Sequence, residues 1–155
     1  GDIEARIKRL GIEKHIDMLG VTDNQNIPPY LKRTGVVVFP STAESSSIAC
    51  SEAMAVGKFI VASDVGGLPE LVGRDGSRGA LVKLVDWTGS NYDAPMTLPE
   101  ARYEALAEAI ADALKSGSPE REHSIATYAK VELSWDVIAT KTLAVYARFI
   151  PDITT

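Results

Sequence analysis

The chain has 155 residues, of which 45% are hydrophobic and 24% are charged, and its formal net charge is −5 at pH 7. This length suits one globular domain with a sizeable core. The negative charge disfavours non-specific binding to nucleic acid, and no run of basic residues forms a patch. Cys50 is the single cysteine, which excludes an internal disulfide and a metal site built from several cysteines.

No apolar stretch approaches the ~20 residues that are needed to span a bilayer. We therefore expect a cytoplasmic protein and leave association with a membrane surface open. Cys50 is expected to be a small buried hydrophobe.

The first elements in chain order are a helix over residues 2–11 and a strand near Ile16–Leu19. A turn is expected at Leu19-Gly20. The loop Gly20-Val21-Thr22 follows this strand at its carboxyl end, where open α/β sheets bind ligands.

Three further apolar runs predict strands, at Val36–Phe39, Phe59–Ala62 and Ala80–Leu84. Their spacing of roughly twenty residues is typical of successive βα units, whose strands are parallel. The first run is uninterrupted, as in strands that are buried on both faces. The expected fold class is therefore α/β, with a Rossmann-like parallel sheet and flanking helices.

Glycines mark the turns between these elements. Gly57 is expected to end a helix in the left-handed conformation. Gly66-Gly67 predicts a turn with positive φ or a close backbone contact. The stretch Gly73–Gly79 is rich in turn residues and should lie near the edge of the sheet.

The last third of the chain is predicted to be helical, over Glu100–Lys115, Pro119–Lys130 and Ser134–Ile150, after a loop over Asp86–Pro99. Ser134 is expected to be an N-cap. Side chains expected on the buried faces of the first and last of these helices are Ala105, Ala109, Ile110, Leu114, Val137, Ile138, Leu143 and Tyr146.

Two carboxylates, Glu44 and Glu52, are separated by seven residues around the expected start of a helix after Pro40. Unpaired N–H groups and the helix dipole attract phosphate at such a start, and Ser45, Ser46 and Ser47 leave room for a ligand there. A carboxylate beside phosphate is itself repelled, so it is better suited to accept hydrogen bonds from hydroxyls. Phosphate flanked by hydroxyls describes a nucleotide-sugar.

Each of these residues also has a purely structural interpretation. Glu52 is then a solvated helix residue, and Glu44 is a loop charge favoured by the helix dipole. One of the three serines is explained as an N-cap, but not all three. Gly66-Gly67 is then a plain tight turn.

The segment from Val36 to Val72 resembles the donor-binding domain of family-four glycosyltransferases, which are retaining enzymes with the two-domain GT-B fold. The resemblance rests on an ordered set of parts: Pro40-Ser41, Glu44, Glu52, Ala53-Met54-Ala55, Gly57, the run Phe59–Ala62 and Gly66-Gly67-Leu68-Pro69-Glu70. A weaker likeness extends from about Ile3 to Ile150 and includes Ser134-Trp135.

The resemblance implies roles for individual residues. Glu52 would accept hydrogen bonds from the ribose, and Glu44 would contact hydroxyls of the transferred sugar and so act at the reacting centre. The remaining donor-binding residues that it implies are Ser45, the backbone of Ser46, Ser47 and Ile48 beside sugar and phosphate, and the backbone of Val21 and Thr22 beside the nucleobase. The family often has glycine in this loop, so Ser45 and Ser47 depart from its pattern.

The resemblance also implies that the substrate is a nucleoside-diphosphate sugar and that no metal or other cofactor takes part. In the family this domain opens with a strand, a Gly-Arg turn and a downstream Lys, which grip the diphosphate. This pattern does not occur here. We therefore expect residues 1–155 to be one nucleotide-sugar-binding domain from a larger enzyme, without its acceptor domain and first βα unit, and inactive alone.

Other functions stay open at this point. A stand-alone nucleotide or nucleotide-sugar sensor would carry the same pocket without chemistry. A sugar-nucleotide epimerase is a related enzyme. A phosphorylase would need a lysine for pyridoxal phosphate in its own motif. A receiver-like module would need an acidic pair after the first strand and a lysine after a later one, and neither set is found.

Overall fold

The computed structural model describes residues 3–86 and 98–150. Three strands, β1 (Val36–Phe39), β2 (Phe59–Ser63) and β3 (Gly79–Val82), form a parallel sheet in the order β1-β2-β3. Val36 lies opposite Phe59, and Ile60 lies opposite Gly79. The three strands predicted from the later apolar runs and the α/β class are confirmed.

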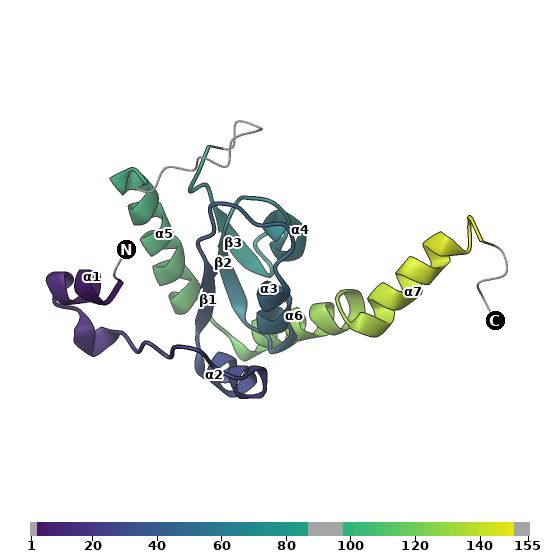
Figure 1. Cartoon of the computed structure of the whole chain (residues 1–155), viewed down its shortest axis with the longest axis horizontal. Coiled ribbons are helices and arrows are strands. Elements are labelled where there is room, and N and C mark those ends of the chain that lie inside the picture. Colours follow the sequence, from purple (N-terminus) through teal and green to yellow (C-terminus); the bar gives the residue numbers. More distant parts are fainter. Residues whose placement is uncertain (1–2, 87–97, 151–155) are drawn as a thin grey trace.

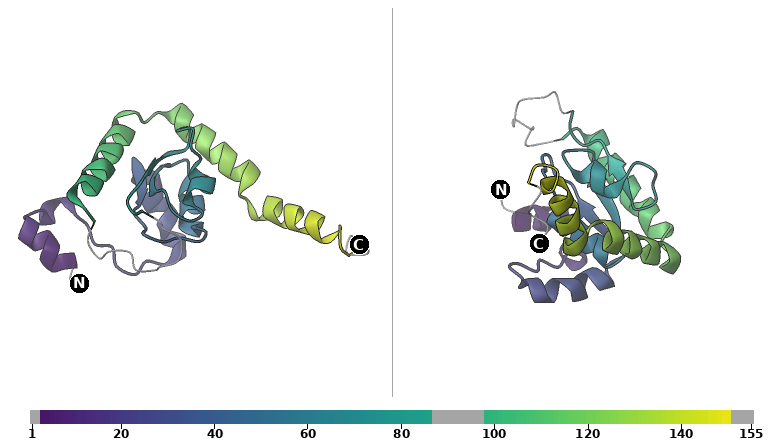
Figure 2. Two further views of the ribbon diagram at one scale, coloured as in Figure 1. Left: turned by 90° about the horizontal axis from the view of Figure 1, so that it is seen from above. Right: turned by 90° about the vertical axis from the view of Figure 1, so that its right-hand side faces the viewer.

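Helices cover both faces of this sheet (Figure 1). α3 (Ile48–Ala55) connects β1 to β2, and α4 (Leu68–Val72) connects β2 to β3. α5 (Glu100–Lys115) contacts all three strands from the opposite face. Figure 2, seen from above, shows the strands between α5 and α4. The central strand β2 is consequently buried along its whole length.

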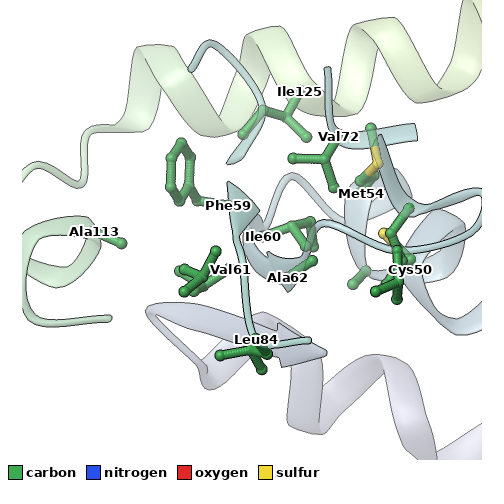
Figure 3. Close-up of a cluster of buried hydrophobic side chains, with 14 of the residues drawn as sticks. Cys50, Met54, Phe59, Ile60, Val61, Ala62, Val72, Leu84, Ala113 and Ile125 are labelled. Carbon is green, nitrogen blue, oxygen red and sulfur yellow. The ribbon is translucent and has the colours of Figure 1, made fainter. Parts of the chain in front are cut away.

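The core lies where β2 meets these helices (Figure 3). Cys50 and Met54 on α3 and Ile60 on β2 are completely buried, and Ile125 of α6 (Pro119–Glu132) is 1% exposed. Burial of Cys50 confirms the expectation for that residue. Each fully buried side chain of this size contributes roughly 1.5–3 kcal/mol relative to an exposed one.

The turn after α3 fixes the position of α6. Gly57 has φ +81°, as expected for a helix end, and a Cβ at this residue would lie 2.6 Å from the carbonyl oxygen of Glu122. The next residue, Lys58, is 4% exposed, and its Nζ lies 2.8 Å from Glu122 Oε1. Arg121 stacks its guanidinium 4.0 Å from the centre of the Phe59 ring. α6 is thereby held against α3 and β2.

The last helix, α7 (Trp135–Tyr146), forms where expected, but its predicted buried face is wrong. Ile138, Leu143 and Tyr146 are all exposed, and no residue of α7 is buried. α7 extends away from the sheet in Figures 1 and 2. Helical spacing of apolar residues predicts the helix but not the element that would cover it. Ser134 occupies the N-cap position without a side-chain cap hydrogen bond.

The same limit explains Leu114 in α5. It was expected on the buried face but is 58% exposed, and Ala113 takes the buried position next to it. Ala105, Ala109 and Ile110 do pack against the core.

The N-terminal part contains α1 (Ile3–Leu10), two 3-10 turns, η1 (Glu13–His15) and η2 (Asn24–Asn26), and α2 (Ile27–Arg33). The strand predicted near Ile16–Leu19 is wrong, because this segment forms no strand. A strand requires hydrogen bonds to a neighbour, and within the described residues β1 pairs only with β2. Gly20 has φ +63°, in agreement with the expected turn.

The stretch between α4 and β3 is a series of bends without regular structure, in agreement with the turn-rich stretch predicted over Gly73–Gly79, and it leads into the edge strand of the sheet. Most of the loop predicted over Asp86–Pro99 lies outside the described residues. Within residues 3–86 and 98–150, every helix is too short or too polar to cross a membrane.

Candidate functional site

Glu44 and Glu52 lie on the segment that leaves the carboxyl end of β1 and turns into α3. Glu44 is half-buried in the loop, where its Oε1 accepts a hydrogen bond from the backbone N–H of Ser45 at 3.1 Å. Glu52 is exposed in the second turn of α3. Within the described part of the chain the side chain of Glu52 has no hydrogen bond or ion pair. Its carboxylate is therefore free to accept hydrogen bonds from a ligand.

Ser47 begins α3. Its buried Oγ accepts a hydrogen bond from the backbone N–H of Cys50 at 3.3 Å, so one of the three serines is the N-cap. The backbone N–H groups of Ile48 and Ala49 have no acceptor within the described residues. The helix start therefore keeps two donors that suit an anion.

The Gly66-Gly67 turn, at the carboxyl end of β2, packs directly on this loop. Gly66 has φ +54°, and a Cβ at this residue would overlap the carbonyl oxygen of Glu44. A Cβ at Gly67 would likewise overlap the carbonyl oxygen of Ser45. Both properties expected of this turn, positive φ and close backbone contact, are confirmed. Two loops at the carboxyl edge of neighbouring parallel strands are thus in contact, at the edge where α/β sheets bind ligands.

A cleft of about 1000 Å³ opens beside Glu44. Its lining residues are Ala43, Glu44, Ser45, Asp64, Val65, Gly66, Pro69, Glu70 and Arg74. Arg74 donates hydrogen bonds to both carboxylate oxygens of Asp64, at 2.8 and 2.7 Å, and this holds the pKa of Asp64 below its ordinary value. Three carboxylates and one guanidinium give the cleft a formal charge of −2. Such a charge suits hydroxyl groups better than phosphate.

A second cavity, of about 880 Å³, lies between α3, α6 and the start of α7. Its lining residues include Ser46, Ile48, Ser51, Glu52, His123, Thr127, Lys130 and Trp135. Glu52 and Lys130 are its formally charged side chains, so the two charges cancel. Trp135 is 76% exposed and presents an aromatic surface beside them.

Glu44 and Glu52 thus line different cavities, which adjoin at one peptide. Ser45 lines the first and Ser46 lines the second, so neighbouring Cα atoms about 3.8 Å apart separate the two walls. A ligand that used both carboxylates would have to pass this peptide. Val21 and Thr22 are not among the residues that line either cavity, and Val21 is fully exposed.

Sequence reasoning missed Asp64, Arg74 and Lys130. Asp64 follows β2 directly, and the position of an acidic residue at the carboxyl end of a buried strand could have identified it. Arg74 lies in the turn-rich stretch, and Lys130 lies near the end of a helix far along the chain. Neither carries a local sequence signal, because their places depend on how α4 and α6 pack.

Cys50 lies beneath this site. Burial, and to a lesser degree the charge of Glu44, raises the pKa of its thiol to about 12. A thiol with this pKa is inert near neutral pH. Among the described residues, no three His, Cys, Asp or Glu side chains are grouped so that they could hold a metal ion.

The sequence matches the family described as glycosyl transferases group 1 over residues 2–93. It is 39% identical, over 120 residues, to alpha-maltose-1-phosphate synthase from Mycolicibacterium smegmatis, a match that covers 76% of this chain and 28% of that enzyme. It is 29% identical, over 149 residues, to D-inositol 3-phosphate glycosyltransferase from Jonesia denitrificans, covering 96% of this chain and 31% of that enzyme.

Solved structures share the fold. Sucrose-phosphate synthase from Thermosynechococcus elongatus superposes with a TM-score of 0.73 at 24% identity, over 96% of this chain and 34% of that one. Anabaena HepE, solved in complex with UDP, superposes with a TM-score of 0.60 at 25% identity, over 94% of this chain and 35% of that one.

The chain spans about a third of the length of these proteins. The family match covers more than half of the chain and includes the β1 loop, α3 and the Gly66-Gly67 turn. This chain therefore belongs to the group 1 glycosyl transferases.

Proposed function

We propose that this chain binds the donor of a retaining glycosyltransferase, a nucleoside-diphosphate sugar whose hexosyl group is transferred to an acceptor. The observation that carries the proposal is the contact between Gly66-Gly67 and the backbone of Glu44-Ser45. This contact supports the loop on which Glu44 lies and fixes it beside the start of α3. The contact therefore gives the Gly66-Gly67 part of the motif a structural role.

The two carboxylates bind hydroxyls at opposite ends of the donor. Glu52 accepts hydrogen bonds from the ribose in the second cavity, and Glu44 accepts them from the transferred sugar in the first. A hydrogen bond to a carboxylate contributes roughly 1.5–3 kcal/mol when water is excluded. The negative charge of the first cavity favours a neutral, hydroxyl-rich sugar there.

The diphosphate crosses the peptide between the two cavities, beside the free N–H groups of Ile48 and Ala49. Negative charge grows on this group as the bond to the anomeric carbon breaks. Fixed N–H dipoles at the start of α3 stabilise that charge without reorganising. Glu44 binds the transferred sugar and is therefore the side chain that acts at the reacting centre. No metal ion is required for this chemistry.

The names of the relatives support a sugar-transfer reaction. Alpha-maltose-1-phosphate synthase and D-inositol 3-phosphate glycosyltransferase are both sugar-transferring enzymes. HepE was solved with UDP, a nucleoside diphosphate.

Titration with nucleoside diphosphates, followed by NMR, tests the proposal. We expect UDP, GDP or ADP to shift resonances of residues 44–52. The Kd should lie in the high micromolar to millimolar range, which corresponds to a favourable binding free energy of about 4–6 kcal/mol. Shifts confined to other regions would contradict the site. Glu52→Gln should weaken a ribonucleoside diphosphate more than its 2′-deoxy analogue.

Glu108→Gln is the matched control, because Glu108 is an exposed glutamate on α5 that lines neither cavity. It should leave both affinities unchanged. Equal weakening of both nucleotides by Glu52→Gln would remove the ribose role. Binding of nucleotides without any contribution from the sugar or from Glu44 would favour a nucleotide-binding module without chemistry.

A further inference from the structure

The second cavity contains one cation, Lys130, on the last turn of α6. We infer that Lys130 binds the diphosphate of the donor; this inference rests on the proposed function and adds a residue to the same site. Lys130 lines the cavity together with Glu52, Ser46 and Ile48. It therefore shares one space with the proposed ribose ligand and with the start of α3.

Packing holds Lys130 in this place. α6 is fixed to the end of α3 by the Lys58–Glu122 ion pair at 2.8 Å and by the close fit of Gly57 on Glu122. Further along α6, Ala129 is 3% exposed and belongs to the core. The residue that follows Ala129 is thereby directed to the edge of the core, where the cavity opens. Its backbone position relative to Glu52 is set by buried contacts.

The charge of Lys130 is also uncompensated. Six other cations have carboxylate partners within 4.0 Å: Lys58, Arg74, Lys83, Arg102, Lys115 and Lys141. The side chain of Lys130 has no ion pair or hydrogen bond with the described residues. Glu52, across the same cavity, has none either. A free carboxylate and a free ammonium in one cavity complement a ligand that carries both hydroxyls and negative charge.

The alternative place for phosphate is the cleft beside Glu44, and its charge disfavours this. That cleft has a formal charge of −2, and its guanidinium, on Arg74, already binds both oxygens of Asp64. The cavity of Lys130 is formally neutral and adjoins the free N–H groups of α3. An ammonium group offers three donors on a flexible stem and binds phosphate as a point charge. Lys130 thus supplies the cation that the helix start lacks.

The experiment compares UDP with uridine, GDP with guanosine and ADP with adenosine, on the folded 155-residue chain. Lys130→Met should weaken the diphosphate that binds best by about five- to tenfold, ~1–1.4 kcal/mol. The matching nucleoside should change by less than about twofold, because it carries no phosphate. Raising the salt concentration should weaken binding of the diphosphate less in this variant than in the original protein.

Two further variants make the result specific. Lys8→Met removes the same charge from an exposed lysine on α1, which lines neither cavity, and should leave binding unchanged. Lys130→Arg keeps the charge and should retain diphosphate affinity within about threefold. An unchanged melting temperature for Lys130→Met is expected, since the side chain is exposed.

Equal effects of Lys130→Met on diphosphate and nucleoside, or no effect on either, would overturn the inference. The proposed function would then stand, provided that the diphosphate still shifts residues 44–52. If the unmodified chain binds none of the three diphosphates near these residues, the proposed function fails together with the inference. The two failures are therefore distinguishable.

Discussion

The backbone of Gly66 lies against the carbonyl oxygen of Glu44, so closely that any Cβ at residue 66 would overlap it. Gly66 also has φ +54°, where other residues are strained. Both constraints act at Gly66, whereas only the backbone constraint acts at Gly76. Gly76 has φ +75°, with nothing within 4 Å of an added Cβ.

Gly66→Ala should therefore lower the free energy of unfolding by more than Gly76→Ala does. Backbone strain alone costs about 1–2 kcal/mol at either residue. The overlap with Glu44 should add at least about 1 kcal/mol and displace the loop. Urea denaturation measures the stability difference, and NMR titration of the same variants measures nucleotide binding. Equal losses of stability in the two variants would show that the loop at Glu44 moves to accommodate the added methyl group at little energetic cost.

Ser47→Ala removes the side-chain cap of α3. We expect it to lower the free energy of unfolding by about 1 kcal/mol, since the N–H of Cys50 loses its acceptor. Ser134→Ala is the control, because Ser134 occupies the same position before α7 without a cap hydrogen bond. It should cost less than about 0.5 kcal/mol. Comparable losses in urea denaturation would contradict the cap.

Lys58 and Glu122 should respond unequally to substitution. Glu122→Ala leaves the ammonium of Lys58, whose side chain is 5% exposed, without its partner. Because Glu122 itself is 47% exposed and water can enter, we expect a loss of about 1–2 kcal/mol. Lys58→Met replaces the buried charge by an apolar chain and leaves a hydrated carboxylate, so it should cost less. Urea denaturation of both single variants and of the double variant measures the coupling energy of the pair, and a coupling near zero would show that the pair is unimportant.

Cys50 should react with thiol reagents only after unfolding. Its pKa of about 12 leaves almost no thiolate at pH 8, and the residue is completely buried. Alkylation by iodoacetamide, followed by mass spectrometry, should be far slower for the native protein than for the protein in urea. Glu44→Gln should change this rate little, because burial is the larger cause of the raised pKa. Rapid native labelling would mean that α3 opens readily.

Asp64 should contribute to the loss of stability in acid. Hydrogen bonds from Arg74 lower its pKa in the folded state. The stabilisation is therefore complete above the unfolded pKa of about 3.9 and disappears as the pH falls through the lower folded value. Melting temperatures between pH 5 and pH 2 should fall less steeply for Asp64→Asn than for the original protein. Asp112→Asn, at an exposed i,i+3 pair with Lys115, is the control and should follow the original curve.

Local patterns were sufficient for much of the fold. Val36–Phe39 and Glu100–Lys115 form with the predicted bounds, because an uninterrupted apolar run and a regular helical period are local properties. Gly57 and Gly66 also follow from local chemistry, since positive φ favours glycine wherever the chain turns so sharply. The motif placed Glu44 and Glu52 on either side of a helix start, as the structure does.

Several predictions that required a distant partner failed or were missing. Ile16–Leu19 has the composition of a strand but no neighbour with which to pair. Ile138 has helical spacing but no covering element. The division of the site into two cavities depends on α4 on one side and α6 on the other. Lys130 became visible as a candidate only through the packing of α6.

Glu122 and Lys130 are eight residues apart on a single helix, which places them about 12 Å from one another along its axis. Because the helix is rigid, a displacement of α6 at Glu122 also displaces Lys130. Variants at Gly57 or Lys58 could consequently reduce nucleotide affinity although neither residue lines either cavity. A lower affinity in such a variant would indicate that α6 has tilted. A residue that touches the ligand is therefore identified only by a variant in which α6 keeps its position.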